Sequence, residues 1–134
     1  DELIRAVRLP IARGPQQFAK VGTRNAMVIA VCSVAVAVDM PARRVGTGIG
    51  SAAPTPVRSA EAEAFAAAHL PWGDGGALDP ELAEEFGRRL AAAGAPIDDV
   101  RGSQAYRRHA LAVLGRRALT WAWADVTGGG GPCG

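Results

Sequence analysis

The chain has 134 residues, of which 49% are hydrophobic and 21% are charged, the ordinary composition of one soluble globular domain. A net charge of +2 argues against a nucleic-acid-binding protein, which normally carries a clustered basic face. The longest apolar run is about a dozen residues, too short for a membrane span, which needs about 20. No signal peptide is apparent at the start, so we expect a cytoplasmic protein with reduced cysteines.

The first predicted strand covers residues 3–9, where apolar and polar side chains alternate imperfectly. Pro10 ends this strand, because proline has no N–H group to donate to a neighbouring strand. Residues 18–21 are a candidate for a further short strand before the turn-like residues 22–25. The first 25 residues therefore predict one or two short strands.

A β-hairpin is predicted next, in the most apolar part of the chain. Residues 26–39 are dominated by Val and Ile, and such β-branched side chains favour a strand. Both faces of this strand would be apolar, so we expect a central strand that is covered on both sides. Residues 45–52 form the second strand, after a short polar turn that contains Pro41. The alternating glycines of residues 46–50 do not lie between a strand and a helix, as a nucleotide loop requires, so we interpret them as small residues beneath a packed helix.

Three helices are predicted after the strands, each with its own N-cap residue. Ser59 begins a helix that ends near His69, and Asp79 followed by a proline begins a second one. Ser103 caps the last helix, residues 104–125. The predicted buried stripe of this helix consists of Tyr106, Ala110, Val113, Leu114, Ala118 and Trp121. Strands followed by helices predict an α+β fold, with a three- to four-stranded antiparallel sheet and three helices packed on one face.

Residues with catalytic or metal-binding chemistry are sparse. The two histidines are isolated, and Cys32 and Cys133 are too far apart in sequence to suggest a metal site or a disulfide. Asp98 and Asp99 are either an acid pair for proton transfer or a loop pair that caps the last helix or binds a neighbouring arginine; we favour the second interpretation. No catalytic residue and no metal ligand is predicted.

Four segments carry a family resemblance, in the right order and at the right spacing. They are residues 2–10, residues 20–31, residues 52–58 and residues 96–108. Together they resemble the C-terminal domain of the FAD-binding subunit of molybdenum hydroxylases, the group of xanthine dehydrogenase and aerobic carbon monoxide dehydrogenase. The resemblance covers residues 1–126, and the Gly-rich residues 127–134 are predicted to be disordered. It also implies that FAD-binding domains precede this segment in the complete subunit.

The resemblance implies contacts with FAD for three residues. Ile4 matches a family position that contacts the cofactor, Lys20 matches a lysine near it, and Arg24 follows in the same turn. From the sequence alone, the favoured interpretation of Lys20 is a solvated charge at the edge of a strand, and only the resemblance shifts the weight toward a contact with the cofactor. Family members often carry an acidic residue shortly after this turn, where this chain has Met27 and Val28. An acid beside the flavin is therefore not expected here.

The function implied by the resemblance is electron transfer in a complex of several subunits. Electrons would pass from molybdopterin on a large subunit, through iron–sulfur clusters on a small subunit, to FAD on this one. This domain would help to close the flavin site and to assemble the complex, and the alternative is an assembly module that never touches the flavin. Trp121, Trp123 and the arginines of the last helix are candidate interface residues, and Trp123 is preferred because it lies off the predicted buried stripe.

Overall fold

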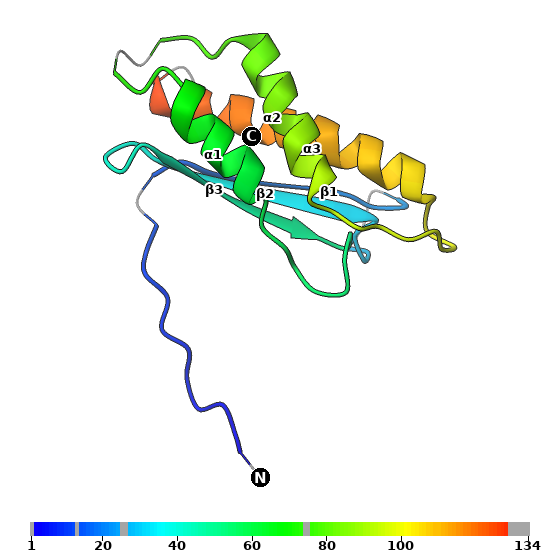
Figure 1. The fold of residues 1–134 in the computed structure, drawn as a ribbon. Coiled ribbons are helices and arrows are strands. Elements are labelled where there is room, and N and C mark those ends of the chain that lie inside the picture. The colour runs from blue at the N-terminus through cyan, green and yellow to red at the C-terminus, as the bar shows by residue number, and fades with distance from the viewer. Residues whose placement is uncertain (1, 13, 25–26, 74–75, 129–134) are drawn as a thin grey trace.

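The computed structural model describes residues 2–12, 14–24, 27–73 and 76–128 as a two-layer α+β domain (Figure 1). One layer is an antiparallel sheet of three strands in the order β1-β2-β3, and three helices form the other layer on one face of it. The predicted fold class is confirmed, and the sheet has the smaller of the two expected numbers of strands.

The sheet is built on a central strand and a tight hairpin. β1 spans Gln16–Val21, β2 spans Cys32–Asp39 and β3 spans Arg44–Gly50. Phe18 lies opposite Ala35, which in turn lies opposite Gly48. This confirms both the short strand predicted at residues 18–21 and the hairpin, although the central strand begins at Cys32 and residues 27–31 of the predicted strand lie in a loop.

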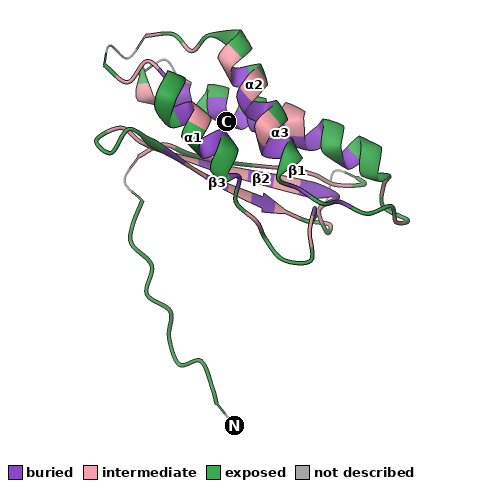
Figure 2. Cartoon of the chain, in the orientation of Figure 1, coloured by how far each residue is buried: buried purple, intermediate pink, exposed green. Residues whose placement is uncertain are grey.

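The core lies between the sheet and the helices, because every second residue of β2 and β3 is buried, as are residues of all three helices (Figure 2). On β2 these residues are fully buried, whereas the residues between them are only partly covered. The buried strand residues that face the helices are Cys32, Val34, Val36, Val38, Val45, Thr47 and Ile49.

Each helix begins at the residue expected to cap it. α1 spans Ala60–His69, α2 spans Pro80–Ala92 and α3 spans Gln104–Val126. The side-chain oxygens of Ser59, Asp79 and Ser103 accept hydrogen bonds from backbone N–H groups of the first turns. Since these side chains satisfy otherwise unpaired N–H groups, the start of each helix is fixed by local sequence.

Two glycines let α2 and α3 pack closely. A Cβ atom on Gly87 would lie 2.3 Å from the carbonyl oxygen of Ala112, and one on Gly115 would lie 3.3 Å from the Cα atom of Gly87. A side chain at Gly87 is therefore incompatible with the observed packing of the two helices. This contact brings Phe86 and Leu90 of α2 into the core, where both are fully buried.

Three predictions about the strands are wrong. Residues 3–9 form no strand, because no other strand of the described chain pairs with them, and their large apolar side chains are 73–97% exposed. Within the described residues the central strand is covered on one face only, because all three helices lie on that face (Figure 1). Gly46, Gly48 and Gly50 do not lie beneath a helix, since the residues between them point toward the helices instead.

The predicted buried stripe of α3 is displaced around the helix. Tyr106 and Trp121 are 48% and 45% exposed, whereas Trp123 is buried and its indole N–H donates to the carbonyl of Gly76. The reason is that α2 packs against a second side of α3, so its buried face is wider than one stripe. Trp123 is therefore a core residue and not an interface candidate, while Trp121 stays available.

Some predictions fall on residues outside the described ranges. Cys133 and nearly all of the Gly-rich tail belong to residues 129–134. The first residue of the predicted tail, Thr127, is ordered at the end of α3, where its N–H donates to the carbonyl of Trp123.

Candidate functional site

The uncovered face of the sheet is a flat surface made of small side chains. Ser33, Ala35 and Ala37 of β2 lie beside three glycines of β3 on this face. At the end nearest the hairpin turn, the surface forms an open depression with a volume of about 1100 Å³. Its lining includes Pro10, Ile11, Gln16, Phe18, Ala37 and Arg44. A planar or apolar body can approach the backbone closely here, because few side-chain atoms stand in the way.

Lys20 and Arg24 lie at the opposite end of this face. Lys20 is near the end of β1, is exposed, and donates from Nζ to the carbonyl oxygen of Val28 at 3.1 Å. Arg24 is exposed in the loop that follows β1, and the described residues place no carboxylate within salt-bridge distance of either side chain. The Lys20–Val28 bond closes the loop, so this lysine is more than a freely solvated edge charge.

Ile4 lies in the extended segment that precedes β1. It is 89% exposed, and the segment runs away from the sheet in Figure 1. Within the described chain it contacts neither Lys20 nor Arg24. The three residues predicted to contact the cofactor thus fall into two places: Lys20 and Arg24 lie at the end of β1 and in the loop after it, and Ile4 lies in the extended segment before β1.

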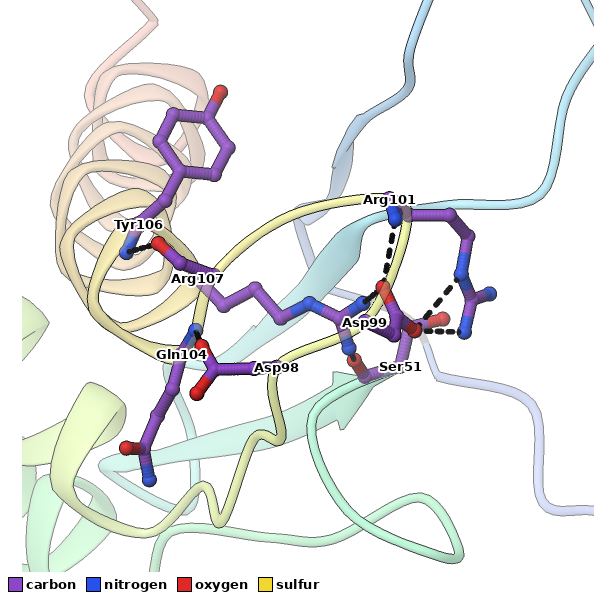
Figure 3. Close-up of polar contacts among 8 residues, drawn as sticks. Ser51, Asp98, Asp99, Arg101, Gln104, Tyr106 and Arg107 are labelled. Atoms are coloured by element: carbon purple, nitrogen blue, oxygen red, sulfur yellow. Dashed lines mark hydrogen bonds and ion pairs between the residues drawn. The ribbon is translucent and has the colours of Figure 1, made fainter.

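Asp98 caps the last helix, as the loop-pair interpretation predicts. Its carboxylate accepts a hydrogen bond from the backbone N–H of Gln104 at 2.6 Å (Figure 3). Ser103 accepts from the N–H of Tyr106 in the same turn, so two side chains share the first turn of α3.

Asp99 is held by two arginines. Its carboxylate accepts from Arg101 at 2.6 Å and from the buried Arg107, whose guanidinium also donates to the carbonyl oxygen of Ser51 (Figure 3). The hydrogen bonds from Arg101 and Arg107 hold the pKa of Asp99 well below its usual range. Asp99 is therefore ionised throughout the physiological pH range and cannot act as a proton donor.

Glu63 covers the outer edge of β3. One carboxylate oxygen accepts from the N–H and from the hydroxyl of Thr47, each at 2.8 Å, and the carboxylate also pairs with Arg58. Burial alone would raise the pKa of Glu63, but the hydrogen bonds from Arg58 and Thr47 outweigh it and keep the pKa below the ordinary value. Glu63 thus stays charged, and its role is structural.

Glu63 is the polar residue that the sequence interpretation missed, whereas Arg107 is the neighbouring arginine that the loop-pair interpretation of Asp98 and Asp99 predicts. Both side chains are 90% or more buried, although charged residues are rarely buried unless they are paired. The sequence patterns give no role to Glu63, and they do not reveal how deeply Arg107 is buried. The signal that points to them is their position: each falls on the side of its helix that carries the small core residues Ala62, Ala66 and Ala110.

Other kinds of site find no support in the described ranges. His, Cys, Asp and Glu side chains gather nowhere there in the groups of three that suggest a metal ion. In the same part of the chain, every helix is too short or too polar to cross a bilayer. Cys32 is fully buried, and burial raises the pKa of its thiol despite the nearby positive charge of Arg107, so it is not a reactive nucleophile.

The geometry describes an α+β domain with a bare sheet face and two exposed positive charges at one end of it, Lys20 in β1 and Arg24 in the following loop. A protein-family comparison identifies its class: residues 17–122 match the CO dehydrogenase flavoprotein C-terminal domain. The chain belongs to this family, which confirms the resemblance found in the sequence.

Solved structures with the same fold agree with the family. Quinoline 2-oxidoreductase from Pseudomonas putida 86 is 16% identical with a TM-score of 0.75, and the match covers 89% of this chain and 40% of that one. The reconstituted CO dehydrogenase from Oligotropha carboxidovorans is 24% identical with a TM-score of 0.70, covering 88% of this chain and 40% of that one. No curated protein matches the chain. This chain spans about 40% of the length of each of these two solved chains.

Proposed function

We propose that this domain closes one side of a flavin site in the FAD-binding subunit of a molybdenum hydroxylase. The observation that carries the proposal is the exposed pair Lys20 and Arg24, positioned beside a bare sheet face in a chain of this family. FAD, when bound, accepts and passes on electrons, and the reduced flavin is stabilised by nearby positive charge. The partners would be a molybdopterin-binding large subunit and an iron–sulfur small subunit.

Lys20 and Arg24 fit such a cofactor. Lys20, at the end of β1, supplies a positive charge whose position is fixed by its hydrogen bond to Val28, and Arg24 adds a second positive charge in the loop that follows β1. Neither charge is neutralised by a carboxylate of the described chain, so both are available to an anionic group. Met27 and Val28 supply no acid that would oppose it. Ile4 would take part once the extended segment before β1 packs against the domain that precedes it.

A second role in assembly is favoured by the position of Trp121. Its side chain is 45% exposed on α3, and tryptophan and arginine are enriched among residues that dominate protein interfaces. An assembly module without flavin contact would use this surface and leave Lys20 without effect on the cofactor. The two roles are separable by mutation.

The test is flavin retention in the FAD-binding subunit that contains this domain. We expect Lys20→Ala to weaken FAD retention after desalting or to slow flavin reduction, while the far-ultraviolet circular dichroism stays unchanged. Arg88→Ala is the matched control, because Arg88 is an exposed charge on α2, in the helix layer and away from the bare sheet face. If Lys20→Ala changes neither FAD retention nor the rate of flavin reduction, the flavin contact is refuted and the assembly role is the one that stands.

Measuring by absorbance how much FAD the 134-residue chain alone retains after desalting decides where FAD is bound. We expect this chain alone to retain no FAD, because the family's Gly-rich FAD-binding segments lie in its preceding domains. Retention by the short chain would show that its own residues form the principal binding site.

A further inference from the structure

The two edge strands of the sheet differ in whether other parts of the chain hydrogen-bond to their outward backbone groups. At the β3 edge, Glu63 accepts from the N–H of Thr47, and Ile49 exchanges two backbone hydrogen bonds with Val57, at 2.8 and 3.1 Å. Val57 and Glu63 thus cover the N–H of Thr47 and both backbone groups of Ile49, which an edge strand normally leaves open. This edge is closed to another strand.

The β1 edge is open. The N–H of Val38 donates to the carbonyl of Pro15 at 2.9 Å. This bond shows which alternate residues, counted along β1 from Pro15, direct their backbone groups toward β2. Since the ladder groups of an antiparallel pair alternate in direction, the N–H and C=O groups of Gln16, Phe18 and Lys20 point away from β2. No backbone hydrogen bond within the described ranges uses them. These groups form a template for one more strand.

We propose that a second copy of this chain covers this edge, with the two β1 strands paired antiparallel about a twofold axis at Phe18. A twofold interface brings the same surface together from both copies, so the surface must complement itself. The surface around Phe18 complements itself. Phe18 of one chain lies opposite Phe18 of the other, and Gln16 of each chain lies opposite Lys20 of the other. No like charges lie directly opposite one another, and the 67% exposed Phe18 ring gains an aromatic partner.

The helix layer is complementary about the same axis. Gln17 of β1 donates to the carboxylate of Asp125 at 2.7 Å, so this side of α3 stands over β1. Trp121 and Arg117 share that side, because residues four apart lie above one another on a helix. β1 and α3 run in opposite directions in Figure 1, so the level of Phe18 lies between Asp125 and Trp121. The axis brings the two Trp121 rings close together and directs Arg117 of each copy toward Asp125 of the other.

The spacing of the layers allows this contact. α3 packs on both β1 and β2, so its axis lies above the space between these strands. With strands about 4.8 Å apart, the α3 helices of the two copies would lie about 10 Å apart. Helices in direct contact have axes about 8–10 Å apart. The sheets can therefore join without forcing the helices into each other.

Sedimentation velocity on the 134-residue chain, over a series of concentrations and without flavin, tests this dimer. We expect a monomer–dimer equilibrium whose dissociation constant rises at least about tenfold in Phe18→Lys, which places two like charges at the axis. Ile97→Lys is the matched control, because Ile97 is equally exposed, at 68%, in a loop away from β1, and it should leave the constant unchanged. A monomeric wild type, or an equal effect of both variants, overturns the proposal.

A cysteine cross-link tests the register. Directly hydrogen-bonded residues of an antiparallel pair have Cα atoms about 5.5 Å apart, within the range of a disulfide. In a Cys133→Ser background, we expect Phe18→Cys to form a disulfide-linked dimer on oxidation with diamide, and Gln16→Cys to form none. Cross-linking at Gln16 and not at Phe18 overturns the register. Because the dimer is measured without flavin, its failure would leave the proposed flavin contact standing, and the reverse also holds.

Discussion

Replacing Glu63 with alanine should destabilise the domain more than any other change of an acidic side chain on α1. The carboxylate accepts two hydrogen bonds from Thr47 and pairs with Arg58, and the whole residue is only 8% exposed. Arg58 is largely exposed, so its ion pair contributes little. The loss therefore comes mainly from Thr47, whose buried N–H would be left without an acceptor.

The expected magnitude follows from that unpaired group. A buried donor without a partner costs about 1–3 kcal/mol, and a hydrogen bond to a charged group contributes about 1.5–3 kcal/mol. We expect Glu63→Ala to lower the free energy of unfolding by about 3 kcal/mol. Glu63→Gln keeps an oxygen for Thr47 but turns an amide donor toward Arg58, so we expect a loss of about 1 kcal/mol. Glu61→Ala, an exposed change in the same turn, should cost about 0.5 kcal/mol.

Urea unfolding followed by circular dichroism measures these differences, and pH gives an independent check. The folded-state pKa of Glu63 is lowered, so its stabilising effect is complete above the unfolded pKa of about 4.3 and is lost as the pH falls through the folded value. The gap between the wild type and Glu63→Gln should be constant near neutrality and shrink below about pH 4. A Glu63→Ala loss no larger than that of Glu61→Ala, or a gap that widens in acid, would refute the role given to this carboxylate.

Two further changes test the helix packing and capping. Gly87→Ala should lower the free energy of unfolding by about 2 kcal/mol or more, because the new methyl group would meet the carbonyl of Ala112; Gly46→Ala, with open space around it, is the control and should not destabilise in the same urea assay. Ser103→Ala should cost about 1 kcal/mol, since the N–H of Tyr106 loses its acceptor, and a loss below a few tenths would show that Asp98 caps α3 alone.

The sequence predicted the parts of the fold that depend on local chemistry. Ser59, Asp79 and Ser103 mark the helix starts because the capping hydrogen bonds form within a few residues of the chain. The hairpin was predictable for the same reason, since β-branched residues flank a short turn that contains Pro41.

The errors arose where a neighbour distant in sequence decides the outcome. The exposure of Tyr106 and the burial of Trp123 depend on the side of α3 against which α2 packs, and the spacing of apolar residues within α3 does not reveal this. Residues 3–9 have the alternation of a strand, but a strand is stable only when another one pairs with it. Of the candidate site, the sequence indicated Lys20 and Arg24 through family resemblance, while the hydrogen bond from Lys20 to Val28 required the structure.

The buried guanidinium of Arg107 also has a consequence for the order of folding. It joins the start of α3 to the carbonyl of Ser51, 56 positions earlier in the chain. Contacts between such distant segments form only after the entropy cost of closing a long loop has been met, whereas hairpins and helical turns close quickly. We therefore expect the loop of residues 98–102 to dock late, after the hairpin and the helices have formed. Substitutions at Arg107 would then speed unfolding while leaving the folding rate nearly unchanged.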